Sequence, residues 1–219
     1  MGKHCSICWE KNNIQPNIAF SDSAATTVKL RILARNQQVC RCDFESINIL
    51  DQTESIKQNF IQCLNNCNVV VFSDYDKGLL KNISELIFLA RNRNKFVIVD
   101  PKSHDFYKYQ NCNIITPNCK ELEAVIGKWY SEVDLTQKVS LLRQNLNIDY
   151  VLLTRSEAGM TIFGNNLKKD FPAQAREVFD VSGAGDTVVA VLSFLIASGS
   201  SLILSLIHIS EPTRRVVIS

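Results

Sequence analysis

The sequence shows no excess of charge of either sign, because 24 Lys plus Arg against 22 Asp plus Glu leave a formal net charge of +2. Binding to nucleic acid through bulk charge is therefore not expected. Binding through a local basic patch is an alternative that the net charge does not exclude. Internal repeats and low-complexity tracts are also missing. With 46% apolar and 21% charged residues, a collagen-like, disordered or coiled-coil chain is excluded. At 219 residues, the chain is long enough for one domain with a sizeable core.

No charged segment followed by an apolar run opens the chain, so we expect no secretory signal and a cytoplasmic protein. The longest stretch without a charged residue, 187–210, raises the question of a membrane span. Its middle, Ser198-Gly199-Ser200-Ser201, is typical of the end of a helix, and the preceding VVAVLSFLIA is too short to cross a bilayer. The sequence therefore predicts a buried core helix and no membrane partner.

The cysteines give only a weak signal. Eight are present, at Cys5, Cys8, Cys40, Cys42, Cys63, Cys67, Cys112 and Cys119. The length of the chain and the lack of a signal favour reduced thiols in a cytoplasm over disulfides. Cys5 and Cys8 have the spacing of a zinc half-site or a redox pair, but no second CxxC or HxxxH follows. Incidental thiols are favoured, and a thiol or metal function is the weaker alternative.

Residues 26–44 (TTVKLRILARNQQVCRCDF) predict two strands joined by a turn near Asn36. Apolar and basic residues alternate along the first of them, from Val28 to Ile32. The basic face is either a solvated surface or a lid that faces an anion.

Beyond residue 51, helical and strand-like patterns alternate. Strands are predicted at 69–72, 96–99, 114–115 and 151–153, and helices around 56–64, 79–90, 119–126 and 131–146. This alternation predicts an α/β fold with a mostly parallel sheet that helices cover on both faces. Polar segments that begin at Ser73, Asp100, Thr116 and Thr154 follow the four strands. Because ligands bind beyond the carboxyl ends of such strands, four polar segments at one edge indicate a site.

The segment from Asp180 to Thr187 (DVSGAGDT) leads into the apolar helix. Gly183 and Gly185 have no Cβ atoms, so the backbone at this helix start is accessible. The unpaired N–H groups there favour an anion such as a transferring phosphoryl group. Asp186 is placed to act as the base that takes a proton from an attacking hydroxyl. The alternative is a glycine-rich turn in which Asp186 only caps the helix. The segment is neither a GxxxxGK[ST] loop nor a GxGxxG fingerprint.

This segment resembles the C-terminal signature of the ribokinase-like (PfkB) carbohydrate kinases. Other matching segments occur in the same order: TTVKLRILARNQQVCRCDFE, VVVFSDYDKGLL, VIVDPKSHDFYKY, IITPNCKELEAVIG, VLLTRSEAGM and FPAQAREVFDVSGAGDT. Together they resemble the D-glycero-β-D-manno-heptose-7-phosphate kinases of ADP-heptose synthesis, over about residues 26–202. The elements RNQQ, SDYxKG and TRSExGM point to these heptose kinases rather than to the superfamily alone.

The resemblance implies a layered ribokinase-like fold with a small β lid at about residues 26–44. It implies ATP-dependent phosphorylation of the anomeric hydroxyl, for lipopolysaccharide core synthesis, with Mg²⁺ as cofactor. Asp186 matches the catalytic base, and Gly183, Ala184 and Gly185 match the anion hole. Asn118 and Glu121 match the NxxE motif that organises Mg²⁺ through water, and Thr154, Ser156, Glu157 and Gly159 match the nucleotide loop. Asp180 matches a residue that orders this loop, with a monovalent cation in some relatives.

The resemblance also implies an acceptor site and a second copy of the chain. Lys29, Arg31, Arg35 and Asn36 lie on the expected lid, and Asp74, Lys77 and Lys102 are weaker candidates for the acceptor pocket. Relatives are expected to form homodimers through the lid. Each assignment has a plain alternative: Asn118 as a helix cap, Glu121 as a surface charge and Lys102 as a solvated side chain.

Two parts of the chain depart from the family pattern. The kinase domain of the family begins with an acidic strand and a Gly-Gly loop that cradles the acceptor, but this sequence has no Gly-Gly pair. We therefore expect part of the N-terminal region to be missing, with residues 1–25 unassigned and 26–202 forming a partial kinase domain. After Leu202 no helical pattern is predicted, and ISEPTRR resembles a translated sequencing adapter. We expect residues 203–219 to be an assembly artefact.

Alternative functions therefore stay open at this point. One is an inactive remnant of such a kinase, and another is a kinase of the same family that acts on a different sugar.

Overall fold

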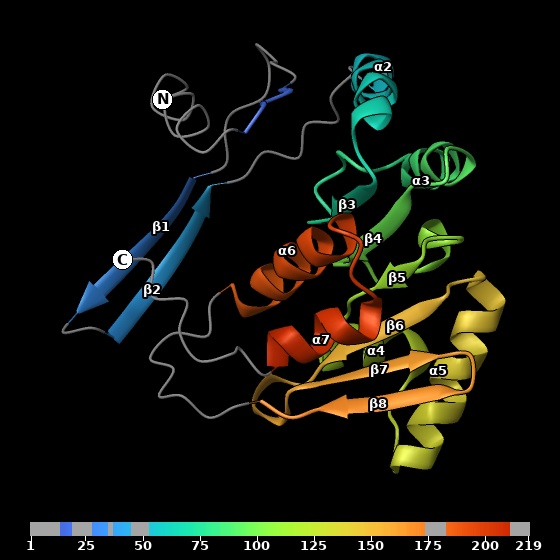
Figure 1. Ribbon diagram of the computed structural model, residues 1–219. Coiled ribbons are helices and arrows are strands. Elements are labelled where there is room, and N and C mark those ends of the chain that lie inside the picture. Colours follow the sequence, from blue (N-terminus) through green and yellow to red (C-terminus); the bar gives the residue numbers. More distant parts are fainter. Residues whose placement is uncertain (1–13, 19–27, 35–36, 45–52, 174–182, 211–219) are drawn as a thin grey trace, which may run out of the picture. The chain divides into compact units, whose positions relative to one another are not determined.

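A computed structural model of the chain describes residues 14–18, 28–34, 37–44, 53–173 and 183–210 (Figure 1). The chain divides into two compact units, Met1–Gln62 and Cys63–Ser219. Each unit is described by itself.

The first unit contains an antiparallel hairpin of strands β1 (Val28–Ala34) and β2 (Gln37–Phe44), with a bulge between Ile32 and Leu33. The two predicted strands are confirmed, and the turn at residues 35–36 lies outside the described residues. Every residue of β1 is exposed. Helix α2 (Thr53–Cys63) follows, in the region where a helix was predicted.

The two faces of the hairpin differ in chemistry, because side chains alternate along a strand. Its apolar face carries three residues of β1 and the three residues of β2 that pair with them: Val28, Leu30, Ile32, Cys40, Cys42 and Phe44. The charged face pairs Lys29 with Asp43 and Arg31 with Arg41. Arg41 donates two hydrogen bonds to the Asp43 carboxylate, at 2.8 and 2.6 Å.

The second unit is built on a six-stranded sheet whose strands follow one another in chain order. They are β3 (Val69–Ser73), β4 (Phe96–Asp100), β5 (Ile114–Ile115), β6 (Tyr150–Thr154), β7 (Met160–Gly164) and β8 (Leu167–Phe171). The pairs from β3 to β6 are parallel, as predicted from the alternation of strands and helices. Strands β7 and β8 add two antiparallel pairs that the sequence pattern did not predict.

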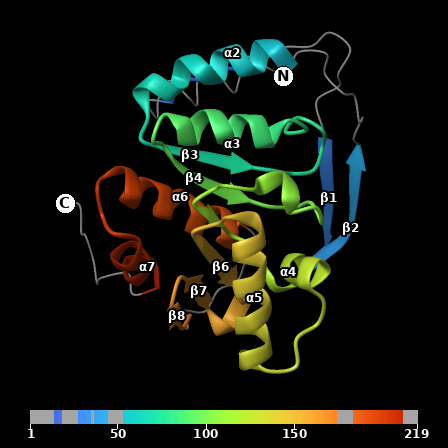
Figure 2. The same cartoon turned by 90° about the vertical axis from the view of Figure 1, so that its right-hand side faces the viewer.

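Helices cover both faces of the sheet (Figures 1 and 2). Helices α3 (Ile83–Asn92), α4 (Cys119–Ile126) and α5 (Glu132–Leu146) lie on one face, and α6 (Ala184–Ala197) and α7 (Leu202–Ser210) lie on the other. The sequence predicted α4 at its observed bounds. It also predicted α5, whose N-cap residue Ser131 accepts a hydrogen bond from the backbone N–H of Asp134.

One cluster of the core lies between the sheet and helices α6 and α7. Ile98, Ile114 and Leu152 project from three neighbouring strands and are fully buried, and Val189 and Leu192 of α6 pack in the same cluster. The apolar run before residue 198 is therefore a helix that contributes Val189 and Leu192 to this cluster, but it is not buried all round as predicted, because Val191 and Phe194 are exposed. In the described part of the chain, every helix is too short or too polar to cross a bilayer.

Helix α7 corrects the prediction that no helix follows Leu202. Residues 202–210 are helical, and the Leu206 side chain is fully buried in the core cluster. The sequence pattern failed here because six of the nine residues are apolar and none is charged, which leaves little polar surface to mark a helical period. Residues 211–219, which contain most of ISEPTRR, lie outside the described residues.

Candidate active site

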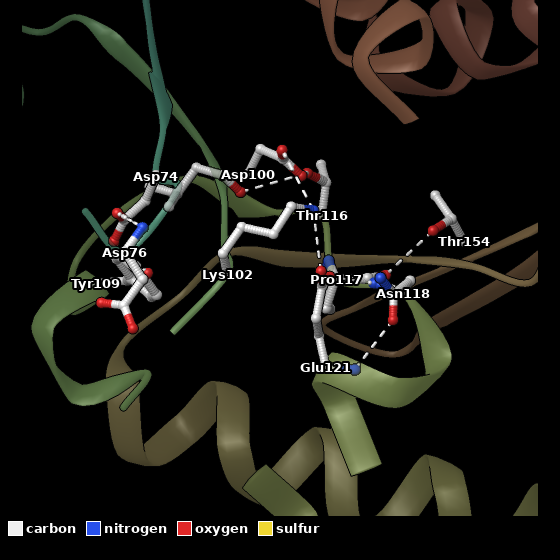
Figure 3. Close-up of polar contacts among 11 residues, drawn as sticks. Asp74, Asp76, Asp100, Lys102, Tyr109, Thr116, Pro117, Asn118, Glu121 and Thr154 are labelled. Atoms are coloured by element: carbon white, nitrogen blue, oxygen red, sulfur yellow. Dashed lines mark hydrogen bonds and ion pairs between the residues drawn. The ribbon is translucent and has the colours of Figure 1, made fainter. Parts of the chain in front are cut away.

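The carboxyl ends of β3, β4, β5 and β6 form one polar edge of the sheet (Figure 3). Ser73 pairs with Asp100 in register, and the N–H of Asp74 donates to the Asp100 carbonyl at 3.0 Å. Asn118 forms a parallel bridge with Thr154. The predicted juxtaposition of the four polar segments is therefore confirmed.

Asn118 and Glu121 form a capping box at the start of α4. The Oδ1 of Asn118 accepts from the N–H of Glu121 at 3.0 Å, and the Oε2 of Glu121 accepts from the N–H of Asn118 at 2.8 Å. Asn118 thus does cap the helix, which was the plain alternative for this residue. The two hydrogen bonds of the box hold both side chains in fixed positions at the edge, and the second carboxylate oxygen of Glu121 takes no part in the box.

Lys102 connects the ends of β4 and α4. Its ammonium lies 2.9 Å from Oε1 of Glu121 and 3.9 Å from Oδ2 of Asp100. The Glu121 and Asp100 side chains are only 13% and 10% exposed, whereas the Lys102 side chain is 39% exposed. Glu121 is therefore not a surface charge, whereas Lys102 is exposed and at the same time paired with Glu121.

The environment shifts the pKa of two of these groups. Burial raises the pKa of the Asp100 carboxyl, and the positive charge of Lys102 opposes that shift only in part. For Lys102, burial lowers the pKa, but the hydrogen bond to Glu121 and the negative charges of Asp100 and Glu121 outweigh it and raise the pKa overall. The hydroxyl of Thr116 donates to Oδ1 of Asp100 at 3.3 Å.

We predict that Asp100→Asn makes the fold more stable at neutral pH. Since the pKa of Asp100 is raised in the folded state, the folded protein binds its proton more tightly than the unfolded chain does. The wild type therefore loses stability as the pH rises from about 4 through the folded pKa, and an amide does not titrate. Urea denaturation at pH 4 and pH 7 should show a larger advantage of the variant at pH 7. An equal difference at both pH values would contradict the prediction.

Helix α6 brings the predicted catalytic segment to the same edge. Gly183 is its N-cap residue, with a left-handed φ of +81° that favours glycine, and Ala184, Gly185 and Asp186 form the first turn. Asp186 is thus not the N-cap residue, and its carboxylate lies in the first turn, where it also stabilises the helix through the helix dipole. Its carboxylate is exposed and lies within electrostatic range of Asp100 and Lys102. The backbone N–H groups of this first turn have no partner within the helix and can bind an anion.

Asp74 is part of a buried hydrogen-bond network and is only 3% exposed. The Tyr109 hydroxyl donates to its Oδ2 at 2.7 Å, the Lys108 ammonium lies 2.7 Å from the same oxygen, and the N–H of Asp76 donates to Oδ1 at 2.8 Å. Burial raises the pKa of Asp74, but these three contacts outweigh it and lower the pKa overall. The contacts hold the segment that leads to the exposed Lys77.

The predicted nucleotide loop is the turn between β6 and β7. Thr154 ends β6, and the N–H of Arg155 donates to the carbonyl of Gly159 at 2.8 Å across the turn. Glu157 is exposed, and Ser156 has a left-handed φ of +51°. The loop therefore has a fixed backbone at the edge of the sheet.

The remaining predicted residues lie in the first unit or outside the described residues. Lys29 and Arg31 lie on the charged face of the hairpin in the first unit. Five further residues lie outside the described residues: Arg35, Asn36, Asp180 and the CxxC pair of Cys5 and Cys8.

The sequence prediction missed three residues of the site: Asp100, Lys108 and Tyr109. Asp100 ends a continuous apolar strand, which is a signal for an edge carboxylate, but its burial and its pairing with Lys102 depend on the fold. Lys108 and Tyr109 lie on a short 3₁₀ helix, and no spacing in the sequence connects them to Asp74, 35 residues before Tyr109.

The donors at this edge suit Mg²⁺. Asp100 and Glu121 offer carboxylate oxygens and Thr116 offers a hydroxyl, which are hard ligands. Within the described ranges, no three carboxylate, imidazole or thiol side chains come close enough to hold a metal ion by themselves.

A parallel sheet whose carboxyl edge joins acidic groups to a glycine-led helix start is the arrangement of α/β carbohydrate kinases. The sequence profile described as "pfkB family carbohydrate kinase" matches residues 3–206, so the chain belongs to the pfkB carbohydrate kinase family. The match includes most of the stretch that the sequence analysis left unassigned. The kinase fold predicted from the sequence is thereby confirmed.

The chain is similar to two curated proteins named "Bifunctional protein HldE". It is 42% identical to the one from Histophilus somni (strain 129Pt) over 200 residues, which cover 88% of this chain and 41% of that protein. It is 39% identical to the one from Haemophilus influenzae over 202 residues, which cover 91% of this chain and 42% of that protein. The chain thus spans about two fifths of the length of these relatives.

Solved structures share the fold. The phosphofructokinase-2 from Escherichia coli in complex with potassium has a TM-score of 0.75 at 16% identity, with 95% of this chain and 70% of that chain covered. The ribokinase from Thermotoga maritima has a TM-score of 0.74 at 18% identity, with 95% and 68% covered. The ribokinase-like fold class is therefore confirmed.

Proposed function

We propose that the chain is the kinase domain that uses ATP to phosphorylate the anomeric hydroxyl of D-glycero-β-D-manno-heptose 7-phosphate. The product is the 1,7-bisphosphate, for ADP-heptose and lipopolysaccharide core synthesis. One observation carries the proposal: in a chain 42% identical to an HldE protein, Asp186 at the start of α6 lies within electrostatic range of the Asp100 and Lys102 pair at the sheet edge. The segments RNQQ, SDYxKG and TRSExGM support the choice of substrate.

Asp186 would act as the general base. Its carboxylate takes the proton of the anomeric hydroxyl while the hydroxyl oxygen forms a bond to the γ-phosphorus of ATP and the bond to the β-phosphate oxygen breaks. The N–H groups of Gly183, Ala184 and Gly185 stabilise the negative charge on the phosphoryl oxygens. Asp186 precedes the apolar part of a core helix, so its backbone is held in place by the burial of Val189 and Leu192.

Asn118 and Glu121 would hold Mg²⁺ through water, and Thr154, Ser156, Glu157 and Gly159 would lie along the nucleotide. The metal, when bound, neutralises charge on the phosphates. Asp180 is proposed to order this loop with a monovalent cation, an idea that the potassium complex of the phosphofructokinase-2 supports.

For the acceptor, we propose that Lys29, Arg31, Arg35 and Asn36 contact the sugar phosphate from the hairpin. Lys77 is a further candidate, whereas the buried contacts of Asp74 favour a role in holding the loop before Lys77.

A second copy of the chain is the proposed partner of the hairpin. Six residues form its apolar face. Four of them are between 43% and 62% exposed: Val28, Leu30, Ile32 and Phe44. Burying such a face against the same face of another copy removes apolar surface from water. Because ATP is the phosphoryl donor, the reaction is proposed to take place in the cytoplasm.

The test is direct detection of the product. Since the sequence has no Gly-Gly loop, turnover is measured on a chimera in which the segment before residue 26 comes from the Histophilus somni relative. With ATP, MgCl₂ and the heptose 7-phosphate, ³¹P NMR should show a second sugar phosphate on the anomeric carbon. The chain itself should bind ATP and Mg²⁺ in isothermal titration. Turnover of fructose 6-phosphate or ribose instead would support a different sugar, and loss of both binding and turnover would support an inactive remnant.

A further inference from the structure

Lys102 is a cation placed among carboxylates at the proposed phosphoryl-transfer site. Its ammonium lies 2.9 Å from Glu121 and 3.9 Å from Asp100, and Asp186 is within electrostatic range. When all are ionised, three carboxylates and one ammonium leave a net charge of −2. The two carboxylates that Lys102 contacts are mostly buried, so they need a cation more than exposed groups do.

We propose that Lys102 is an internal counter-ion that competes with a divalent cation for Glu121 and Asp100, so that the site prefers a metal–nucleotide complex over the bare metal. This inference rests on the proposed kinase function. A metal that arrives alone must displace a positive charge that is already paired. A metal that arrives with a polyphosphate brings negative charge and oxygen ligands of its own, so the displaced ammonium gains a new anion.

The side chain of Lys102 suits such an exchange. Its stem is flexible and 39% exposed, so the ammonium can move without a change in the core. The capping box, in contrast, keeps Glu121 in place whether or not Lys102 contacts it. The competing role for Lys102, as a ligand of the acceptor sugar, predicts no effect on metal binding.

The test measures binding of Mn²⁺ to the full chain by electron paramagnetic resonance, without nucleotide and then with ATP. Without nucleotide, Lys102→Met and Lys102→Gln should each bind Mn²⁺ about tenfold more tightly than the wild type, because a nearby positive charge is lost. Lys102→Arg keeps the charge and should stay close to the wild type. With ATP present, the difference between Lys102→Met and the wild type should fall to about threefold or less.

Lys95→Met is the matched control, since Lys95 lies at the amino end of β4 and Lys102 follows its carboxyl end. It removes the same charge and should leave Mn²⁺ affinity unchanged. Circular dichroism confirms that each variant is folded. Unchanged or weaker Mn²⁺ binding in both Lys102→Met and Lys102→Gln would overturn the proposal. The Mn²⁺ measurement does not involve a sugar, so its result does not depend on whether the heptose is the correct substrate.

Discussion

Asp186→Asn is expected to lower kcat by about 100-fold or more, which is the usual size of a general-base contribution. The amide keeps the shape of the side chain but cannot accept the proton of the attacking hydroxyl. Asp186 is exposed in the first turn of α6, so the substitution removes a base and leaves the core intact. Turnover is measured on the chimera described above, by release of ADP at saturating ATP and heptose 7-phosphate.

A measurement of ATP binding shows whether Asp186→Asn has lost only its general base or has lost the nucleotide site as well. ATP with Mg²⁺ should still bind to Asp186→Asn in isothermal titration, with an affinity within about threefold of the wild type, because the proposed nucleotide contacts lie on other elements. Glu123→Gln removes a carboxylate from α4 outside the proposed site and serves as the control, with near-normal turnover. Near-normal turnover of Asp186→Asn would show that another group takes the proton.

Gly159→Ala is expected to lower the free energy of unfolding by about 3 kcal/mol. Gly159 has a left-handed φ of +87°, and a Cβ atom there would lie 2.1 Å from the carbonyl oxygen of Phe171 and 2.6 Å from the nitrogen of Ala173. Both contacts are with backbone of the segment that ends β8, so the neighbours cannot turn away as a side chain would. The tight packing of this turn gives a structural reason for a glycine in the proposed nucleotide loop.

Gly127→Ala is the matched control because Gly127 also has a left-handed φ, of +74°, but no atom lies within 4 Å of the Cβ position. It should cost less than Gly159→Ala, about 1 to 2 kcal/mol, because backbone strain is its only contribution. Urea denaturation followed by circular dichroism gives both values, and the midpoint should shift without a change in slope. Equal losses in the two variants would show that the close approach to β8 does not matter.

The parallel half of the sheet was predictable because each of its strands is a short apolar run with a polar end. Strand β4 (FVIVD) is the clearest case, since its buried residues are continuous and Asp100 marks the edge. Strands β7 and β8 were missed for the opposite reason. The run LKKDF carries three charged residues in a row, and it forms a strand because it pairs with β7 rather than because of its own pattern.

Some residues of the candidate site were also predictable from the sequence, and others were not. The glycines before Asp186 and the spacing of Asn118 and Glu121 were visible in the sequence, because helix starts and capping boxes are local. The partners of Asp74 were not visible, since Tyr109 reaches it from 35 residues away along the chain.

The sequence by itself determined the order of the strands and helices from β3 to β6, the polar ends of those four strands and the glycine-led start of α6. These features depend on residues within a few positions of one another, so local sterics and hydrogen bonding decide them. The tertiary structure alone decided that Asp100 is buried and that Lys102 lies between it and Glu121, 19 residues further along. Burial and the pairing of charges depend on which segments meet in space, and that is set only when the parallel strands align and the helices cover them.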